Sequence, residues 1–385
     1  MNFDLTEEQL AMQKLARDFA DKEIAPVVDA DEKAHRFQRE IVRKMGELGF
    51  LGCPIPEEYG GSGVGFLGHA IVTEEIARVS GSLRAPFNMQ TMGTSMTILK
   101  FGNEEQKKKY IPKLVSAEWL GAFAITEPNA GSDVASMKTT AAEEGDYFVL
   151  NGTKTWITYA SVADVAVMFA YTDKSLKHKG MSAFILDMKS PGISTPEISD
   201  KFGWHACPTG EIIMEDVKVP KENLLGKTGQ GFAIVMADLD CTRLSCAAGA
   251  VGVAQACIDA CVKYCNEREQ FGQLIGKFQM NQEIIADMVV GTEAARLLTH
   301  RCAVQKDQGR RNTLETSMAK YFATENGVKA ADQAIKLYGA YGISGEYPVE
   351  RYYREAKIYQ IVEGAANIQK TIIGMDALGY RRANG

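Results

Sequence analysis

The spacing of apolar residues changes twice along this chain of 385 residues, and that change constrains its fold most. Apolar side chains recur at helical spacing up to about residue 118. They form short β-rich runs from about 119 to 225, and helical spacing returns from about 226 onward. Helices and strands that are segregated along a chain are typical of an α+β protein. We therefore expect an N-terminal helical domain (1–118), a middle antiparallel β-sheet domain (119–225) and a C-terminal helical bundle (226–385).

Local signals favour the same division. Thr6, followed by Glu7, Glu8 and an apolar-periodic run, is typical of a capped helix start. The β-rich runs, bounded by Gly, Pro, Asp and Lys, are 147–150, 165–171 and 182–186. The amphipathic stretches that predict a bundle with an oligomer face are 232–240, 247–267, 279–308 and 314–338.

Charge and hydropathy exclude some partners. The net charge is −6 and no basic stripe occurs, so we expect no nucleic-acid partner. No apolar run approaches ~18 residues, so we expect no membrane span. The start of the chain is polar and acidic and resembles neither a signal peptide nor a transit peptide, which favours a bacterial cytoplasmic protein.

Cysteine usage indicates neither disulfides nor a metal site. Eight cysteines in a chain of this length are not a disulfide framework. Cys257, Cys261 and Cys265 recur every four residues, on one helix face, which fits either a metal site or a stripe of small packed residues. Because no cysteine or histidine pair has zinc spacing, we expect packing and no metal.

One carboxylate near the end of the chain is a candidate base. Glu363 follows apolar residues and precedes Gly364, Ala365 and Ala366. A carboxylate among such neighbours is partly desolvated, which raises its pKa toward the value that suits proton abstraction from carbon near neutral pH. The alternative is an ordinary solvated glutamate at a helix start.

Three loops carry further signals. Residues 123–133 read as a strand end and a turn whose amides and hydroxyls can bind an anion or the edge of a heterocycle. Asn151-Gly152 predicts a hairpin that delivers Trp156 and Thr158 on its second strand, as a stacking wall or as plain core. Residues 340–351 form a Gly-rich helix end and loop, with neither a P-loop nor a dinucleotide-binding glycine motif.

Together these segments resemble the acyl-CoA dehydrogenase family over the whole chain. The motifs that carry the resemblance, in order, are 56–61 (PEEYGG), 126–133 (TEPNAGSD), 151–158 (NGTKTWIT), 267–272 (EREQFG), 346–348 (EYP) and 363–364 (EG). The resemblance implies an FAD-dependent oxidoreductase that desaturates acyl-CoA thioesters. Glu363 would remove the α-proton, and the β-hydrogen would leave as hydride to the flavin.

The resemblance also implies roles for individual residues. The thioester oxygen would be held by the Glu363 N–H and a flavin hydroxyl. Residues implied to bind the cofactor are Phe123, Ile125, Thr126, Ser132, Trp156, Thr158, Arg268, Phe271, Gly339 and Gly342. Residues implied to bind the substrate are Arg84, Ser132, Asp240, Arg243, Val362 and Gly364. Two positions depart from the common pattern: Ala365 replaces a Thr and Lys336 replaces a Gln, which affects only details of flavin contact.

Within the family the chain looks closest to the glutaryl-CoA dehydrogenase branch. Arg84 stands where that branch binds a distal carboxylate, whereas the alternatives are that it faces solvent or pairs with a protein carboxylate. Val362 stands where decarboxylating members have Tyr, which favours glutaconyl-CoA as product. Val362 with Phe87, Met89 and Gln90 could equally shape a pocket for a cyclic or branched acyl group.

Other functions and the partners follow from the same resemblance. An acyl-CoA oxidase and a non-catalytic scaffold are the alternatives from other classes, and retention of Glu363 argues against the scaffold. Arg268 and Phe271 match positions that reach the flavin of a neighbouring subunit, which implies a homo-oligomer, most simply a tetramer. The expected electron acceptor is an electron-transfer flavoprotein.

Overall fold

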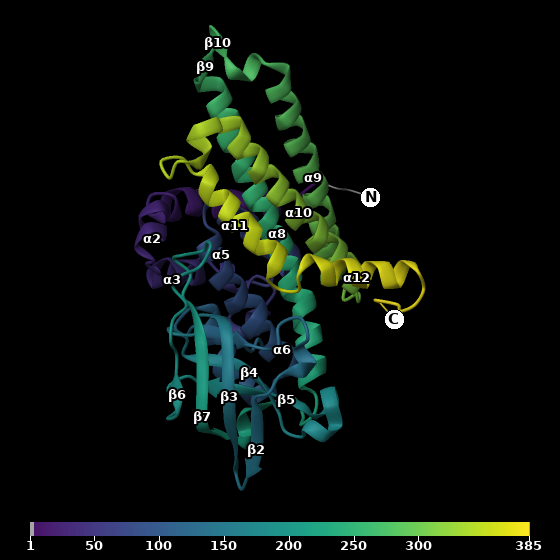
Figure 1. Ribbon diagram of the computed structural model, residues 1–385. Coiled ribbons are helices and arrows are strands. Elements are labelled where there is room, and N and C mark those ends of the chain that lie inside the picture. The colour runs from purple at the N-terminus through teal and green to yellow at the C-terminus, as the bar shows by residue number, and fades with distance from the viewer. Residues whose placement is uncertain (1–3, 385) are drawn as a thin grey trace.

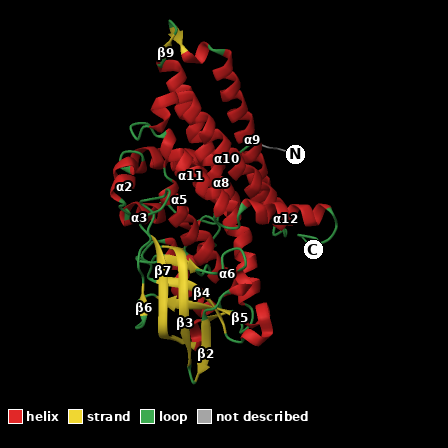
Figure 2. Cartoon of the chain, viewed as in Figure 1, coloured by secondary structure: helices red, strands yellow, loops and turns green. Residues whose placement is uncertain are grey.

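Helices form the upper part of the molecule and a β-sheet forms its lower end, as the computed structural model of the chain shows (Figure 1). The structure describes residues 4–384, so the first three residues of the polar start lie outside it. The strands gather at one end, apart from a small ribbon at the opposite end (Figure 2). The predicted α+β class, with a sheet between two helical parts of the chain, is confirmed.

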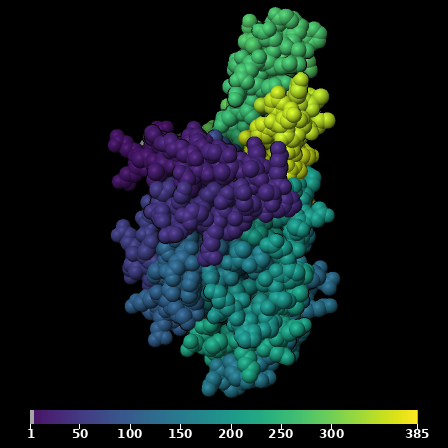
Figure 3. All heavy atoms as spheres, turned by 90° about the vertical axis from the view of Figure 1, so that its left-hand side faces the viewer, coloured from purple at the N-terminus to yellow at the C-terminus, as the bar shows by residue number. Residues whose placement is uncertain are grey.

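The first helix begins at a polar side chain that caps it. Thr6 Oγ1 accepts from the Gln9 N–H at 3.3 Å, and the Gln9 side chain accepts from the Thr6 N–H at 3.0 Å, so the start predicted at Thr6 is confirmed. Figure 3 shows the first helices lying across the molecule above the sheet, with the end of the bundle projecting beyond them. The helices of this part are α1 (Glu7–Phe19), α2 (Val28–Ala34), α3 (Arg39–Glu47), α4 (Gly65–Val79), α5 (Gly81–Asn88), α6 (Met96–Phe101) and α7 (Glu104–Val115).

The middle part folds into an eight-stranded sheet in the order β6-β7-β3-β2-β4-β5-β8, with β1 joined to β4. Its strands are β1 (Gly121–Ala124), β2 (Thr140–Glu144), β3 (Tyr147–Thr158), β4 (Val165–Tyr171), β5 (Met181–Asp187), β6 (Ile193–Ser194), β7 (Thr209–Pro220) and β8 (Leu224–Leu225). The sheet is mixed rather than wholly antiparallel, because β1 runs parallel to β4 and one bridge joins β2 to β4 in parallel. The β2–β3 hairpin lies in the connection from β1 to β4, which gives the chain the length that a parallel pair needs.

The hairpin predicted at Asn151-Gly152 is wrong. This pair lies inside β3, and the turn between β2 and β3 is at Gly145 and Asp146. A Cβ at Gly152 would lie 2.4 Å from Thr139 Oγ1, and the register of β3 against β7 shifts at this point. The glycine therefore belongs to an irregularity where another segment approaches closely, a role that the local sequence does not distinguish from a turn.

The C-terminal part is a bundle of long helices. Its elements are α8 (Gly231–Glu267), the hairpin β9 (Glu269–Gln270) and β10 (Gln273–Leu274), α9 (Gln279–Asp307), α10 (Thr313–Tyr338), α11 (Val349–Ile361) and α12 (Ala366–Ala377). The stretches expected at 232–240 and 247–267 form one helix, because residues 241–246 between them continue it and are buried. Cys257, Cys261 and Cys265 are all buried in the core of this bundle, as expected for a packing stripe.

α8 is more apolar than the sequence inspection indicated. One 18-residue window of this helix has a mean hydropathy of 1.5, so by length and composition it could cross a membrane. However, 78% of that window is buried inside the protein, against neighbours that include α4, α9, α10 and α11. α8 is therefore the central helix of the bundle.

The predicted domain divisions fall in loops. The first, after residue 118, lies between α7 and β1, and the second, after residue 225, lies between β8 and α8. One hydrophobic core crosses the first division, since Phe19 and Phe50 belong to the same buried cluster as Phe148 and Phe184 of the sheet. The division into three domains stays a prediction.

Candidate active site

Glu363 lies in the short loop between α11 and α12, in a left-handed backbone conformation with φ of 58°. A non-glycine residue in this conformation costs roughly 1–3 kcal/mol and persists only where its surroundings hold it. Such residues cluster at active sites, which makes the loop the first place to look for chemistry.

Three long side chains hold the backbone of this loop. Arg243 of α8 donates from Nε to the Glu363 carbonyl at 3.3 Å. Lys320 of α10 and Gln369 of α12 each donate to the Gly364 carbonyl at 2.9 Å. Lys320 is fully buried and also donates to the Gln360 carbonyl at the end of α11, at 3.4 Å. The loop is therefore fixed from three helices.

The carboxylate of Glu363 is nearly buried, with 11% of its side chain exposed. Its Oε1 accepts from Asn88 Nδ2 at 2.9 Å and from Arg84 Nη1 at 3.3 Å. Its Oε2 has no hydrogen-bond partner within residues 4–384. The alternative of a solvated glutamate at a helix start is wrong.

The charge state of Glu363 is set by opposing effects. Burial raises the pKa of the carboxyl, while the positive charges of Arg84 and Lys320 and two hydrogen bonds lower it, and the net pKa lies above the ordinary value. The direction agrees with the expectation from its apolar neighbours. The group can therefore accept a proton through the oxygen that no side chain occupies.

Arg84 is fully buried, so the alternative that it faces solvent is wrong. The other alternative, that it pairs with a protein carboxylate, is confirmed, because Arg84 pairs with Glu363. Arg84 also lies over the ring of Tyr359, 5.1 Å from the ring centroid. Its Nε and Nη2 have no hydrogen-bond partner in the described part of the chain. A buried guanidinium with unused donors fits a bidentate anion, because leaving such donors unpaired is costly.

Asn88 was missed by the sequence inspection. It follows Arg84 by four residues on α5, so both side chains project from one face of the helix. That spacing was the signal that could have found it. The Gln90 side chain, in contrast, is fully engaged with the fold: it accepts from the Gly121 N–H at 2.8 Å and donates to the Leu114 and Trp119 carbonyls, both at 2.7 Å.

The other residues predicted to bind the acyl-CoA also have contacts within the fold. Phe87 is buried and stacks on His69 with ring centroids 4.9 Å apart. Val362 packs against the core of the C-terminal bundle. Asp240 and Arg243 form an ion pair of 3.1 Å on α8, and Thr313 donates to Asp240 at 2.6 Å. Arg243 thereby joins Asp240 to the Glu363 loop.

A second group of predicted residues lies in the sheet part. Phe123 and Ile125 are buried at and just beyond the end of β1, and Thr126 follows them. The Thr155 N–H donates to the Thr126 carbonyl at 2.9 Å, which joins this turn to β3. Ser132, on the exposed part of the turn, and Thr158, at the end of β3, complete the group.

Trp156 is the exposed aromatic of this group. Its side chain is 58% exposed, and its backbone is left-handed where β3 bulges against β7. The bulge turns the indole away from the core, so core packing does not account for it.

A buried ion pair that the sequence inspection missed supports the same turn. Lys154 Nζ lies 2.8 Å from Glu127 Oε1 and donates to the Ile125 carbonyl at 3.1 Å. Glu127 also accepts from Thr139 and from the Lys138 N–H. Burial lowers the pKa of Lys154 to about 8, although the Glu127 carboxylate opposes this shift.

A third group lies at the opposite end of the molecule. Phe271 is at the tip of the β9–β10 hairpin, 94% exposed, with a left-handed backbone (Figure 1). Arg268 lies over the ring of Tyr341, 5.5 Å from the centroid, in the segment that contains Gly339 and Gly342. This group and the sheet lie at opposite ends of one chain, so one chain alone does not bring them together.

The two positions that depart from the family pattern have plain structural roles. Ala365 precedes α12, whose first turn has no side-chain cap. Lys336 pairs with Asp332 on the surface of α10 at 2.7 Å.

Comparison with known proteins defines the class. Family models described as the N-terminal, middle and C-terminal domains of acyl-CoA dehydrogenase match residues 6–118, 122–217 and 229–378. The chain belongs to the acyl-CoA dehydrogenase family and is an FAD-dependent oxidoreductase.

Individual members of the family that are similar to this chain include glutaryl-CoA dehydrogenases. A glutaryl-CoA dehydrogenase of Desulfococcus multivorans is 55% identical over 389 residues, which cover 100% of both chains. A structure of a glutaryl-coenzyme A dehydrogenase in complex with glutaryl-CoA has a TM-score of 0.98 and 54% identity, and covers 100% of this chain and 98% of that one. A chain in a structure described as an electron transferring flavoprotein of Acidaminococcus fermentans has a TM-score of 0.97 and 43% identity, and covers 98% of this chain and 100% of that one.

The sheet residues fit a flavin. The exposed Trp156 offers a flat aromatic face, and Thr126, Thr158 and Ser132 supply hydroxyls in the same part of the chain. When bound, FAD supplies a hydride acceptor that side chains lack.

Proposed function

We propose that the protein oxidises glutaryl-CoA to glutaconyl-CoA without releasing carbon dioxide. The observation that carries this proposal is the buried Arg84, which contacts the Glu363 carboxylate and keeps two nitrogens without a partner among residues 4–384. The similar glutaryl-CoA dehydrogenase of Desulfococcus multivorans supports the choice of acyl group.

In this proposal Glu363 is the base. The α C–H bond of the thioester breaks, and the proton passes to the carboxylate oxygen that accepts no hydrogen bond from residues 4–384. Arg84 and Asn88 hold the other oxygen, so they orient the carboxylate while Arg84 binds the distal carboxylate of the substrate. Arg243, Lys320 and Gln369 keep the loop rigid during the transfer.

Val362 supports retention of the distal carboxylate. This residue directly precedes the base and offers only an apolar surface, packed against the bundle core. It has no hydroxyl with which to donate a proton or a hydrogen bond to a carbanion left by decarboxylation. We therefore expect the acyl chain to keep all of its carbons.

A panel of CoA thioesters tests the proposal. Flavin bleaching should be fastest with glutaryl-CoA and slower with butyryl-CoA, and chromatography should show glutaconyl-CoA rather than crotonyl-CoA. Faster bleaching with a cyclohexane- or cyclohexene-carboxyl-CoA would overturn the choice of acyl group. Oxygen consumption that matches turnover would make the protein an oxidase and exclude electron-transfer flavoprotein as its acceptor.

We also propose that the protein is a cytoplasmic homotetramer. Phe271 and Arg268 lie too far from the sheet to reach the flavin of their own chain, so a neighbouring copy would receive them (Figure 1). The Phe271 ring, which is 94% exposed at the tip of the hairpin, would be buried by that neighbouring copy. A monomer with full FAD occupancy in light scattering would contradict this assembly.

A further inference from the structure

α5 contacts α11 at two successive levels, and at a third level it contacts the loop after α11 that carries the base. At the first level the Glu355 carboxylate accepts from the Gly81 N–H at 3.2 Å. At the second level Arg84 lies over the Tyr359 ring at 5.1 Å. At the third level Arg84 and Asn88 donate to Glu363. The contact between Glu355 and Gly81, which is the farthest from the base, therefore joins the same helix that carries Arg84 and Asn88 to the helix that leads into the Glu363 loop.

Glu355 is fully buried, and its contacts fix where α5 begins. A Cβ at Gly81 would lie 2.2 Å from Trp204 Nε1 and 3.2 Å from the Glu355 carboxyl carbon, so the start of α5 sits directly against both. A carboxylate at the start of a helix also stabilises its free N–H groups. Arg84 lies in the first turn after Gly81, so a shift at the start of α5 moves its side chain.

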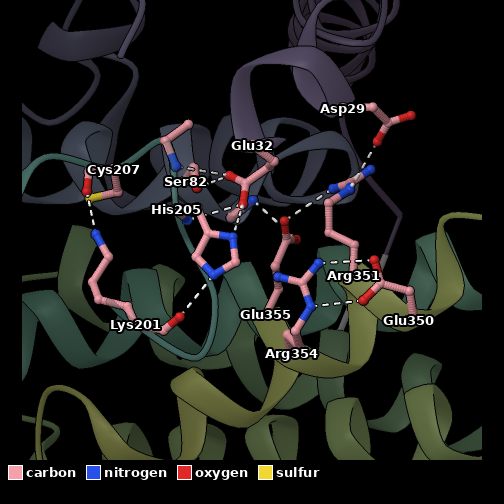
Figure 4. Close-up of polar contacts among 12 residues, drawn as sticks. Asp29, Glu32, Ser82, Lys201, His205, Cys207, Glu350, Arg351, Arg354 and Glu355 are labelled. Carbon is pink, nitrogen blue, oxygen red and sulfur yellow. Dashed lines mark hydrogen bonds and ion pairs between the residues drawn. The ribbon is translucent and has the colours of Figure 1, made fainter. Parts of the chain in front are cut away.

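The surroundings of Glu355 hold it in place (Figure 4). Arg351 on the same helix donates to Glu355 at 3.0 Å and to the Val79 carbonyl at 3.0 Å, just before α5. From α2, Glu32 accepts from Ser82 and from the His205 N–H, and Asp29 pairs with Arg351 at 3.3 Å. The first turn of α5 is therefore clamped between α2 and α11.

We propose that Glu355 is a positioning residue that keeps Arg84 in place against Glu363 by holding the start of α5 on α11. This role rests on the proposed function where it concerns specificity, since Arg84 matters most for an acyl group that carries a carboxylate. Glu355 touches neither the Glu363 carboxylate nor Arg84 directly, so it acts through the helix.

The test is a double-mutant cycle that combines Glu355→Gln with Arg84→Met. Glu355→Gln keeps the shape but weakens the acceptor and removes the charge beside Arg351. We expect kcat/KM to fall about tenfold with glutaryl-CoA and less than about twofold with butyryl-CoA, within the range of coupled residues. In the Arg84→Met background the same change should cost less than about twofold with either thioester.

Two further variants serve as a matched control for Glu355→Gln and as a second test of the same contact. Glu350→Gln is the matched control, because Glu350 also pairs with an arginine of α11, Arg354, at 2.8 Å, but has no contact with α5 among its hydrogen bonds and ion pairs. Glu350→Gln should leave kcat/KM unchanged with both thioesters. Glu355→Asp keeps the charge but withdraws the carboxylate from Gly81, and it should reproduce the selective loss even if Glu355→Gln does not fold.

Other outcomes separate this proposal from the proposed function. An unchanged loss when Arg84 is absent would overturn the positioning role while the substrate stands. Equal losses for both thioesters that disappear in the Arg84→Met background would keep the positioning role and remove Arg84 from substrate selection. Wild-type enzyme that does not prefer glutaryl-CoA would overturn the proposed substrate. The same cycle on the thioester that it prefers then decides the positioning role, because Arg84 also contacts the base.

Discussion

Arg84 and Glu363 form one ion pair, with the guanidinium Nη1 3.3 Å from the carboxylate oxygen, although 279 positions separate the two residues in the sequence. The residue proposed to select the acyl group and the residue proposed to deprotonate it are thus direct neighbours. Any change at one of them alters the environment of the other, and the first two predictions depend on this coupling.

Replacing the base should separate binding from chemistry. Glu363→Gln keeps the size of the side chain and its contact with Arg84, but the amide cannot take the proton. We expect the rate of flavin reduction to fall by about 10²–10⁴-fold, as for loss of a general base, while the Kd for the acyl-CoA changes little. Stopped-flow reduction and a titration of the flavin spectrum measure the two quantities. Full activity would place the base elsewhere.

Removing the guanidinium should affect substrates unequally. Arg84→Ala leaves the distal carboxylate of glutaryl-CoA unpaired in a buried site, so kcat/KM should fall. The fall should correspond to a loss of about 2–5 kcal/mol of transition-state stabilisation. Butyryl-CoA, which has no distal charge, should lose much less. Steady-state kinetics with the two thioesters decide this, and equal losses would mean that Arg84 serves only to hold Glu363.

The acid side of the pH profile should respond to Lys320. Proton abstraction needs the ionised carboxylate, so kcat/KM should rise with pH as Glu363 loses its proton, at a pKa above the ordinary value because the group is buried. Lys320 lowers that pKa through its positive charge. Lys320→Gln removes the charge and should move the rising limb to higher pH. A limb that stays in place, or moves to lower pH, would contradict the assignment of the base.

The flavin wall can be tested with a matched pair of exposed aromatics. The purified protein should be yellow with noncovalent FAD. Trp156→Ala should weaken FAD binding by about 0.5–1.5 kcal/mol or more, the amount that an aromatic contact adds beyond burial. Phe202, exposed to a similar degree at 57% against 58% for Trp156, is the control. Phe202→Ala should leave the Kd for FAD unchanged, and an equal effect of both variants would argue against Trp156 as the wall.

The sequence predicted those features that depend on residues close together along the chain. The capped start at Thr6 and the raised pKa of Glu363 follow from short segments, and the structure confirms both. Lys320 and Gln90 depend on contacts with distant helices or strands, which no local pattern encodes.

The hairpin predicted at Asn151-Gly152 is wrong for the same reason, because a contact from another segment decides the conformation. Asn151-Gly152 carries a turn signature, but Thr139 from the adjacent strand segment determines what the glycine is for. Pairing across a sheet overrides local preference in such cases.

The left-handed backbone at Glu363 has a consequence for the stability of the protein. Glycine adopts this conformation without strain, and glycine also carries no buried carboxyl group. A Glu363→Gly variant is therefore expected to be inactive, and to unfold at a higher temperature than the native enzyme only when an anion such as formate replaces the carboxylate beside Arg84, because a buried guanidinium without a counter-ion is costly. At position 363, the backbone conformation favours glycine for stability, whereas turnover requires glutamate.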